Sequence, residues 1–376
     1  MTYKAFQDFY HEEPIKHLVL HNHNGVLISP PFATEKCKEY SKVMCLDGDN
    51  VTFIDLDLPP ATSKFNAIAS IGDSVWFIPY GIWDDFNVVV QLKNGSPIYH
   101  NINLPGKGQF YNMATDGKTA FSFPLGYEDT SYGIYIKDEK VQIIDFNKQG
   151  HTKLHMGTVY CNGSYWSAPR GDTPGYCDLV KFDGNEITRY EIKVKNPHIT
   201  RKYTDIIVYG NKLFCMPYGE EPGIKEVIEF DTFTETYVLH DLDIPDFAKK
   251  FNTSVLVDDT IISLPYGDEM STDSNWGLLF DVNTKEHKVF DIGITFGGKY
   301  RFRAGINYQG KAMFLPTGTP SCPILIIDTD GNVVSKEYSS DFLIGRPIKH
   351  NNIVKTMAYS FKDKESYVMS LDSFLR

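Results

Sequence analysis

The sequence predicts an all-β chain built from eight copies of one four-stranded module. Three observations support this prediction. A Lys followed by an aromatic residue, Leu or His recurs every 44 to 50 residues along the 376-residue chain. A Pro, usually inside an apolar-Pro-x-Gly string, follows each of the first seven members after 14 to 17 residues. No segment repeats its apolar residues with the 3.6-residue period of a helix over three turns.

The Lys motif marks the start of each module. Its members are Lys16, Lys64, Lys153, Lys202, Lys250, Lys299 and Lys349, with Gln109 in the one position that lacks Lys. The Pro strings read IPYG at 78–81, FPLG at 123–126, APRG at 168–171, MPYG at 216–219, LPYG at 264–267 and LPTG at 315–318, whereas the first copy reads SPPF. We therefore expect modules to begin near residues 16, 64, 109, 153, 202, 250, 299 and 349.

Each module contains two hairpins. A tight-turn signal such as Asn24-Gly25 or Asn162-Gly163 lies between the Lys and the Pro, and alternating apolar residues flank it. Two further strand-like runs follow the Pro, for example NVVVQL and PIYHNINL, which Asn94-Gly95 joins. The sequence thus predicts four antiparallel strands per module.

This pattern resembles the β-propeller superfamily, in which four-stranded blades surround a channel. The resemblance covers the whole chain and implies a single domain over residues 1–376. The WD and GH dipeptides of WD40 blades and the double glycine of kelch blades do not recur from module to module, since each occurs only once in the sequence. The Pro-Tyr-Gly string is similar to YncE-like and virginiamycin-lyase-like propellers in its turns and strands, but not in catalytic residues.

The two ends of the chain predict how the propeller closes. The eighth module stops near Asp372, before its fourth strand. The opening segment TYKAFQDFY, residues 2–10, has the spacing of a fourth strand, so we expect it to complete the last blade and remove an exposed sheet edge. The alternative is seven blades with a C-terminal extension.

Charge and hydropathy restrict the partners. Lys and Arg number 37 against 48 Asp and Glu, a net charge of −11, which argues against nucleic acid or an anionic membrane as a partner. There is no signal-peptide h-region and no run of 18 apolar residues. We expect a cytoplasmic monomer with reduced cysteines.

The repeated motifs predict an anion-binding face. The first strand of a blade starts, and the second ends, on one face, so the Lys and Pro motifs should surround the channel mouth together. The predicted ligand-binding residues are Lys16, Lys64, Lys153, Lys202, Lys250, Lys299, Lys349, Tyr80, Arg170, Tyr218 and Tyr266. In the alternative interpretation each Lys is a solvated strand start that pairs with an acidic residue of the same face.

Positions that differ between modules are the candidates for catalysis. The residues just inside the first strand are Asn66, Asn112, His155, Asp205, Asn252, Arg303 and Asn351. The ionisable members His155, Asp205 and Arg303 could serve a lyase or hydrolase. In the alternative interpretation these side chains hydrogen-bond to each other and to channel water.

No cofactor is predicted, although a divalent metal is left open. His17, His21 and His23 lie on one face of a predicted strand and are the metal-ligand candidates. The sequence lacks HExxH, GxSxG and Walker strings. We therefore place a binding protein for a small anionic ligand or a protein partner first, a lyase or hydrolase second, and a structural or assembly component third.

Overall fold

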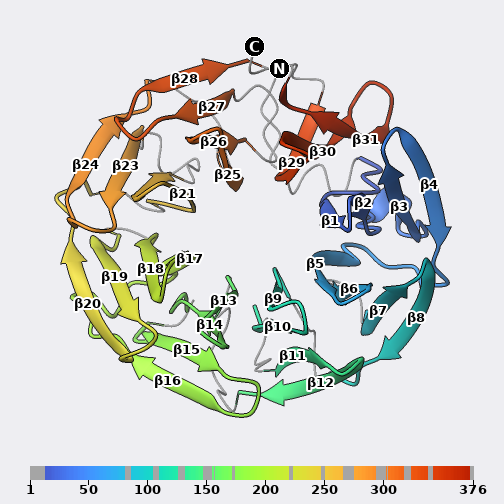
Figure 1. The fold of residues 1–376 in the computed structure, drawn as a ribbon, viewed down its shortest axis with the longest axis horizontal. Helices are drawn as coiled ribbons and strands as arrows, with labels where there is room; N and C mark the ends of the chain where they lie inside the picture. The colour runs from blue at the N-terminus through green and yellow to red at the C-terminus, as the bar shows by residue number, and fades with distance from the viewer. Residues whose placement is uncertain are drawn as a thin grey trace. The chain divides into compact units, whose positions relative to one another are not determined.

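The computed structural model is an all-β, eight-bladed β-propeller, as the repeat predicts (Figure 1). It describes residues 13–80, 86–104, 110–125, 132–146, 155, 157–171, 174–219, 223–246, 250–265, 275–293, 302, 304–316, 323–337 and 342–372. Among these residues, seven sheets have four strands, and the eighth has three. The strand predicted at residues 2–10 lies outside the described residues, and the seven-bladed alternative is wrong.

The chain falls into two compact units, Pro14–Arg201 and a second that joins Met1–Glu13 to Lys202–Arg376. The first unit holds a short 3-10 helix, Glu35–Cys37, and four sheets. Their strands are β1 (His21–His23), β2 (Val26–Ser29), β3 (Lys42–Asp47), β4 (Asn50–Asp55), β5 (Phe65–Ile71), β6 (Ser74–Pro79), β7 (Val88–Lys93), β8 (Ser96–Asn101), β9 (Ala114–Thr115), β10 (Thr119–Ser122), β11 (Tyr132–Lys137), β12 (Lys140–Asp145), β13 (Val159–Cys161), β14 (Ser164–Ser167), β15 (Asp178–Phe182) and β16 (Ile187–Glu191).

The second unit holds the other four sheets. Their strands are β17 (Tyr203–Tyr209), β18 (Lys212–Pro217), β19 (Glu226–Asp231), β20 (Thr236–Asp241), β21 (Thr253–Val257), β22 (Thr260–Leu264), β23 (Trp276–Asp281), β24 (His287–Asp291), β25 (Ala304–Tyr308), β26 (Lys311–Leu315), β27 (Ile324–Ile327), β28 (Val333–Lys336), β29 (Phe342–His350), β30 (Ile353–Ser360) and β31 (Glu365–Ser370). Glu13 accepts hydrogen bonds from Tyr359 (2.8 Å) and Lys364 (2.6 Å) of the eighth sheet.

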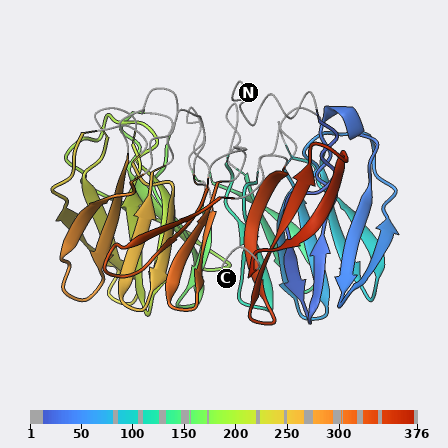
Figure 2. The same ribbon diagram turned by 90° about the horizontal axis from the view of Figure 1, so that it is seen from above.

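Consecutive strands pair antiparallel within every sheet, and Figure 2 shows the strands of each unit from the side. The first strands of neighbouring sheets lie beside one another: β1, β5, β9 and β13 in the first unit, and β17, β21, β25 and β29 in the second. Polar side chains on these strands therefore meet across sheet boundaries.

Burial decreases from the middle strands to the last strand of a sheet. Every residue of β6 (SVWFIP) is buried, whereas β20 (TYVLHD) alternates between partly buried and exposed residues. The middle strands are apolar on both faces because neighbouring sheets pack face to face. Val43 of the first sheet, for example, shares one core cluster with Phe65, Phe77 and Val90 of the second.

The Lys motif owes its repetition to the backbone contacts between sheets. The Lys16 carbonyl accepts from Phe32 N (2.8 Å), and the Phe32 carbonyl accepts from Lys64 N of the next sheet (2.8 Å). The same relay runs from Lys202 through Tyr218 (2.8 Å) to Lys250 (3.1 Å). We call this arrangement the Lys relay. Since buried backbone groups must be paired, it fixes the spacing between Lys and Pro motifs.

The aromatic residue after the Lys anchors the same junction. Phe65 pairs with Pro79, and Tyr203 pairs with Pro217, before an irregularity in each ladder. Both aromatic side chains are fully buried. The motif therefore places one ring in the core at the point where two sheets join.

The side chain of Lys64 also stabilises this junction, through its ammonium group. Lys64 is fully buried, and its Nζ donates to the carbonyls of Ala61 (2.9 Å) and Lys38. A buried ammonium group needs such acceptors because burial removes its water. Lys64 thus joins the segment before β5 to the segment before β3.

The eighth sheet differs in register from the expected module. Its first strand begins at Phe342, before Lys349, and Lys349 is exposed and pairs with Val354 beside the turn. Lys64 and Lys202, in contrast, directly precede their first strands. The eighth copy lacks an apolar-Pro-x-Gly string, so the sequence offered no second marker for its register.

We expect Lys64→Met to lower the free energy of unfolding by about 3 kcal/mol, because the Ala61 and Lys38 carbonyls lose their charged donor. Urea denaturation measures the change. The matched control is Lys42→Met, which removes an exposed ammonium 3.6 Å from Asp55 and should cost less than about 1 kcal/mol. Equal losses in the two variants would contradict the role assigned to Lys64.

Candidate functional site

The predicted ligand-binding residues differ widely in exposure. Lys64, Lys202 and Lys250 are fully buried and Tyr218 is buried; Lys16, Tyr80 and Arg170 are partly buried; Lys349 is exposed. Lys153, Lys299 and Tyr266 lie outside the described residues. The Lys16 ammonium lies 5.6 Å from the centre of the Tyr40 ring. A shared ring of ammonium groups stays a prediction.

Lys250 has an electrostatic environment of its own. Burial lowers its pKa from 10.5 to about 8, an effect that nearby Asp246 opposes and nearby Lys225 reinforces. Lys225 forms an ion pair with Asp246 at 2.9 Å. Two cations therefore lie near one carboxylate at the start of β21.

Polar side chains at the starts of the first strands bridge to the next sheet. Asn66 Nδ2 donates to the Tyr111 carbonyl (3.3 Å), and Asn252 Nδ2 donates to the Phe302 carbonyl (3.3 Å). Asn112 makes two such bonds with the Thr158 backbone, of 3.2 and 2.9 Å. These amides supply both a donor and an acceptor, which suits them to a neutral structural bridge.

Asp205 replaces the amide by a carboxyl group in the equivalent region of β17. Its Oδ2 accepts from Ser254 N at 2.8 Å, and Ser263 Oγ donates to Ser254 Oγ at 2.8 Å. Burial raises the pKa of Asp205 from 3.8 to about 7; the hydrogen bonds and the charge of Arg346 oppose this rise. Asp205 is thus a carboxyl that exchanges its proton near neutral pH, a property found often in functional sites.

His155 is a core residue. It is 1% exposed; its Nδ1 lies 3.0 Å from Ser167 Oγ, and its Nε2 lies 3.5 Å from Tyr176 Oη. Burial, reinforced by the charge of Arg189, lowers its pKa from 6.5 to about 3. His155 belongs to the first unit and Asp205 to the second, and Arg303 lies outside the described residues, so the three-residue catalytic set stays a prediction.

The three metal candidates separate into two environments. His17 is buried, with Nδ1 3.1 Å from the Pro30 carbonyl and Nε2 2.9 Å from Tyr40 Oη. His21 and His23 instead both contact Ser70. Burial lowers the pKa of His17 and of His21 to about 4. Within the described part of the chain, no three His, Cys, Asp or Glu side chains form a group that could hold a metal ion.

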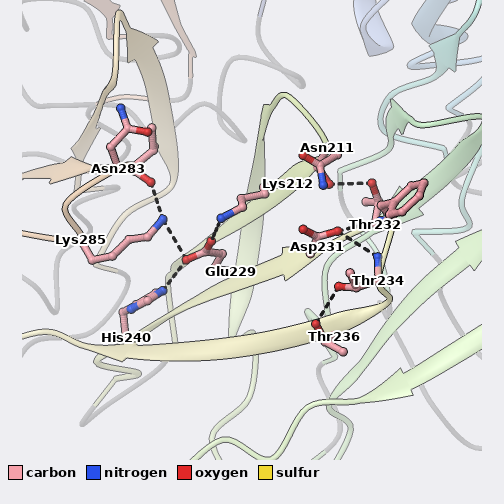
Figure 3. Close-up of polar contacts among 12 residues, drawn as sticks. Asn211, Lys212, Glu229, Asp231, Thr232, Thr234, Thr236, His240, Asn283 and Lys285 are labelled. Carbon is pink, nitrogen blue, oxygen red and sulfur yellow. Dashed lines mark hydrogen bonds and ion pairs between the residues drawn. The ribbon is translucent and has the colours of Figure 1, made fainter.

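A buried carboxylate in the second unit was missed at the sequence level (Figure 3). Glu229 on β19 contacts Lys212 on β18 (2.5 Å), His240 on β20 (2.7 Å) and Lys285 in the turn before β24 (2.9 Å). Burial by itself raises the pKa of Glu229, but these three partners outweigh it and lower the pKa from 4.5 to about 2. The cluster joins the fifth and sixth sheets.

No family model matches this chain, and the search of curated proteins found no match. Solved structures do resemble it. It is similar to BamB from Moraxella catarrhalis, with a TM-score of 0.61 and 11% identity over 95% of this chain and 97% of that one. It is also similar to the designed Ika8 protein, with a TM-score of 0.58 and 12% identity over 95% of this chain and 98% of that one. A third similar structure is virginiamycin B lyase from Staphylococcus aureus, with a TM-score of 0.51 and 10% identity over 91% of each chain.

The comparisons place the chain in the class of β-propeller proteins. At identities of 10 to 12% they show the fold alone. Within the described residues, no helix is long and apolar enough to cross a membrane.

Asp205→Asn should change how stability depends on pH. The pKa of Asp205 is raised from 3.8 to about 7 on folding, so wild-type protein should lose stability as the pH rises through that range. The variant lacks this loss and keeps an acceptor for Ser254. The difference in melting temperature, variant minus wild type, should therefore increase as the pH rises from 3.8 to about 7. Exposed Asp57→Asn is the control. A difference that does not vary with pH would contradict the assignment.

Glu229→Gln should act in the opposite pH range. The pKa of Glu229 falls from 4.5 to about 2 on folding, so its stabilisation is complete above 4.5 and disappears towards 2. At neutral pH we expect the variant to lose about 2 kcal/mol of unfolding free energy, because charged hydrogen bonds are lost. Chemical denaturation at neutral and acidic pH measures both effects. A deficit that persists unchanged in acid would exclude the charged cluster as its cause.

Proposed function

We propose that this chain is a binding propeller that takes a small anionic ligand at the first strands of the Lys202–Arg376 unit, with Arg346 as the main contact. One observation carries the proposal. Asp205 on β17 and Arg346 on β29 place opposite charges within electrostatic reach of each other, in two blades of the same unit. At three comparable positions, Asn66, Asn112 and Asn252, neutral amides bridge to the next sheet.

The backbone around Arg346 is suited to presenting its side chain. The pairing of β29 with β30 is irregular between Ile344 and Pro347, and Arg346 lies within this irregularity. Thr356 Oγ1 donates to the Arg346 carbonyl at 3.2 Å, which holds the backbone there. The side chain is partly buried. A guanidinium group in such a place can bind a carboxylate or phosphate through two parallel hydrogen bonds.

Cationic residues lie at the same end of the neighbouring strands. Lys202 directly precedes β17, and Lys250 lies just before β21, which contains Ser254. Lys250, Lys225 and Asp246 together carry one excess positive charge. We therefore retain the prediction of a small anionic ligand, which came from the repeated Lys residues. We assign its main contact to Arg346, which is not one of the repeated residues.

Asp205 should couple this binding to protons. With a pKa of about 7, the carboxyl group is partly ionised near neutral pH and repels an approaching anion. Protonation removes that repulsion and lets the hydroxyl group of the acid donate a hydrogen bond. We expect affinity for an anion to increase as the pH falls through 7.

Arg346→Gln tests the proposal with Lys349→Gln as the matched control, because Lys349 is an exposed cation at the end of the same strand. Thermal melting is followed in phosphate and in citrate. A ligand at about 100 times its Kd adds about 2.7 kcal/mol to the unfolding free energy. We expect wild type and the Lys349 variant to be stabilised alike, and the Arg346 variant to bind at least about tenfold more weakly.

Added salt should weaken the effect, since it screens charge. Equal stabilisation of the two variants would overturn the assignment of Arg346. Absence of stabilisation by either anion in wild type would overturn the anionic ligand.

A further inference from the structure

Two imidazole rings converge on one hydroxyl group in the Pro14–Arg201 unit. His21 and His23 are two residues apart on β1, so their side chains leave the same side of the strand. His21 Nε2 lies 2.7 Å from Ser70 Oγ, near the end of β5, and His23 Nδ1 lies 2.9 Å from the same atom. All three side chains are partly buried. Neighbouring first strands thus bring two ring nitrogens to a single point.

The protons at this point can be assigned. A hydroxyl group has one proton, so Ser70 donates to one imidazole and accepts from the other. Asn24 Nδ2 lies 3.4 Å from His23 Nε2, which makes that nitrogen an acceptor and leaves the His23 proton on Nδ1. His23 then donates to Ser70, and Ser70 donates to His21 Nε2. If the His23 proton moves from Nδ1 to Nε2, then His21 Nε2 and His23 Nδ1 both present a lone pair to the point that Ser70 Oγ occupies.

We propose that His21 Nε2 and His23 Nδ1 bind one Zn²⁺ ion, with water completing the coordination. Zinc accepts imidazole nitrogen at about 2.0–2.1 Å and prefers four ligands. Both nitrogens already lie within hydrogen-bond distance of one atom, so a rotation of the Ser70 side chain gives the ion room. His17 is excluded, since Pro30 and Tyr40 occupy its two nitrogens.

The rigidity of the hairpin favours this site. β1 pairs with β2 through His21 with Ile28 and His23 with Val26, and the turn between them has both residues at positive φ, Asn24 at 51° and Gly25 at 86°. This geometry is that of a tight two-residue hairpin turn. The two histidines therefore keep their separation without help from the metal.

Asn24 would become the outer partner of the metal ligand His23. After the tautomer change, His23 Nε2 carries the proton, and the exposed Asn24 side chain can turn its Oδ1 to accept it. A carboxylate at this position would accept more strongly, and such outer partners change metal affinity by about 10- to 100-fold. Asn24→Asp should therefore tighten zinc binding.

Zinc titration of the metal-free, full-length protein by calorimetry tests the site. We expect one Zn²⁺ per chain at this site, and His21→Ala and His23→Ala each to weaken binding by more than about tenfold. The matched control is His198→Ala, which removes an exposed histidine from a loop of the same unit and should leave affinity unchanged. Electron paramagnetic resonance of bound Cu²⁺ should show two coupled nitrogens in wild type and fewer in the His21 variant.

Asn24→Asp gives a test that does not depend on a core substitution. Its control is Asn22→Asp, which adds the same charge at an exposed residue between the two histidines. We expect zinc affinity to rise by about tenfold for Asn24→Asp and to change much less for Asn22→Asp. Equal zinc affinity in wild type and His21→Ala, or equal gains in the two aspartate variants, would overturn the proposal.

Discussion

Backbone hydrogen bonds between consecutive sheets are the constraint on which this propeller depends. In the series Lys16, Phe32 and Lys64, the Lys16 carbonyl is used within its own blade, and the Lys64 N–H is used by the blade before it. The series Lys202, Tyr218 and Lys250 repeats this pairing. Water is excluded there, so an unpaired N–H or carbonyl would cost more than an ordinary hydrogen bond contributes. The buried Lys64 ammonium adds two further bonds to the same junction. The spacing of the sequence repeat follows from this pairing.

The same constraint decides where the protein can carry chemistry. The Lys relay sets the first strands of neighbouring sheets side by side, and their polar side chains then bond across the boundary. Where the side chain is an amide, as at Asn66, these bonds are neutral and structural. Where it is a carboxyl group, as at Asp205, burial raises the pKa towards neutrality and creates a group that responds to protons. Departures from the repeat are therefore better guides to function than the repeat itself.

The sequence predicted the blades, because two markers with constant spacing, the Lys and the Pro, frame a turn signal in most copies. It could not predict which lysines keep their ammonium groups in water, since burial of Lys64 depends on the carbonyls of Lys38 and Ala61. In the last blade only one marker was present, and Lys349 accordingly lies at the turn end of its strand.

Long-range partners explain the other differences. The HNH run correctly indicated two side chains on one side of a strand, but Ser70 comes from another blade, and no local pattern identifies it. The approach of Lys285 to Glu229 likewise joins two blades. Asp205 was recognisable as ionisable from the sequence, whereas its raised pKa required the buried environment and Arg346. Local periodicity thus predicted secondary structure, and charge chemistry appeared only once the sheets were packed.

The Lys relay also bears on how such a chain could have arisen. A segment that starts at one relay lysine and stops before the next contains a carbonyl for its own blade, an N–H for the preceding blade and a carbonyl for the following one. Duplication of such a segment would reproduce a compatible junction at both of its ends, because each repeat mainly contacts its immediate neighbours. Tandem copying with later divergence of single positions, such as Asp205, is then enough to place an individual ionisable group on a regular scaffold.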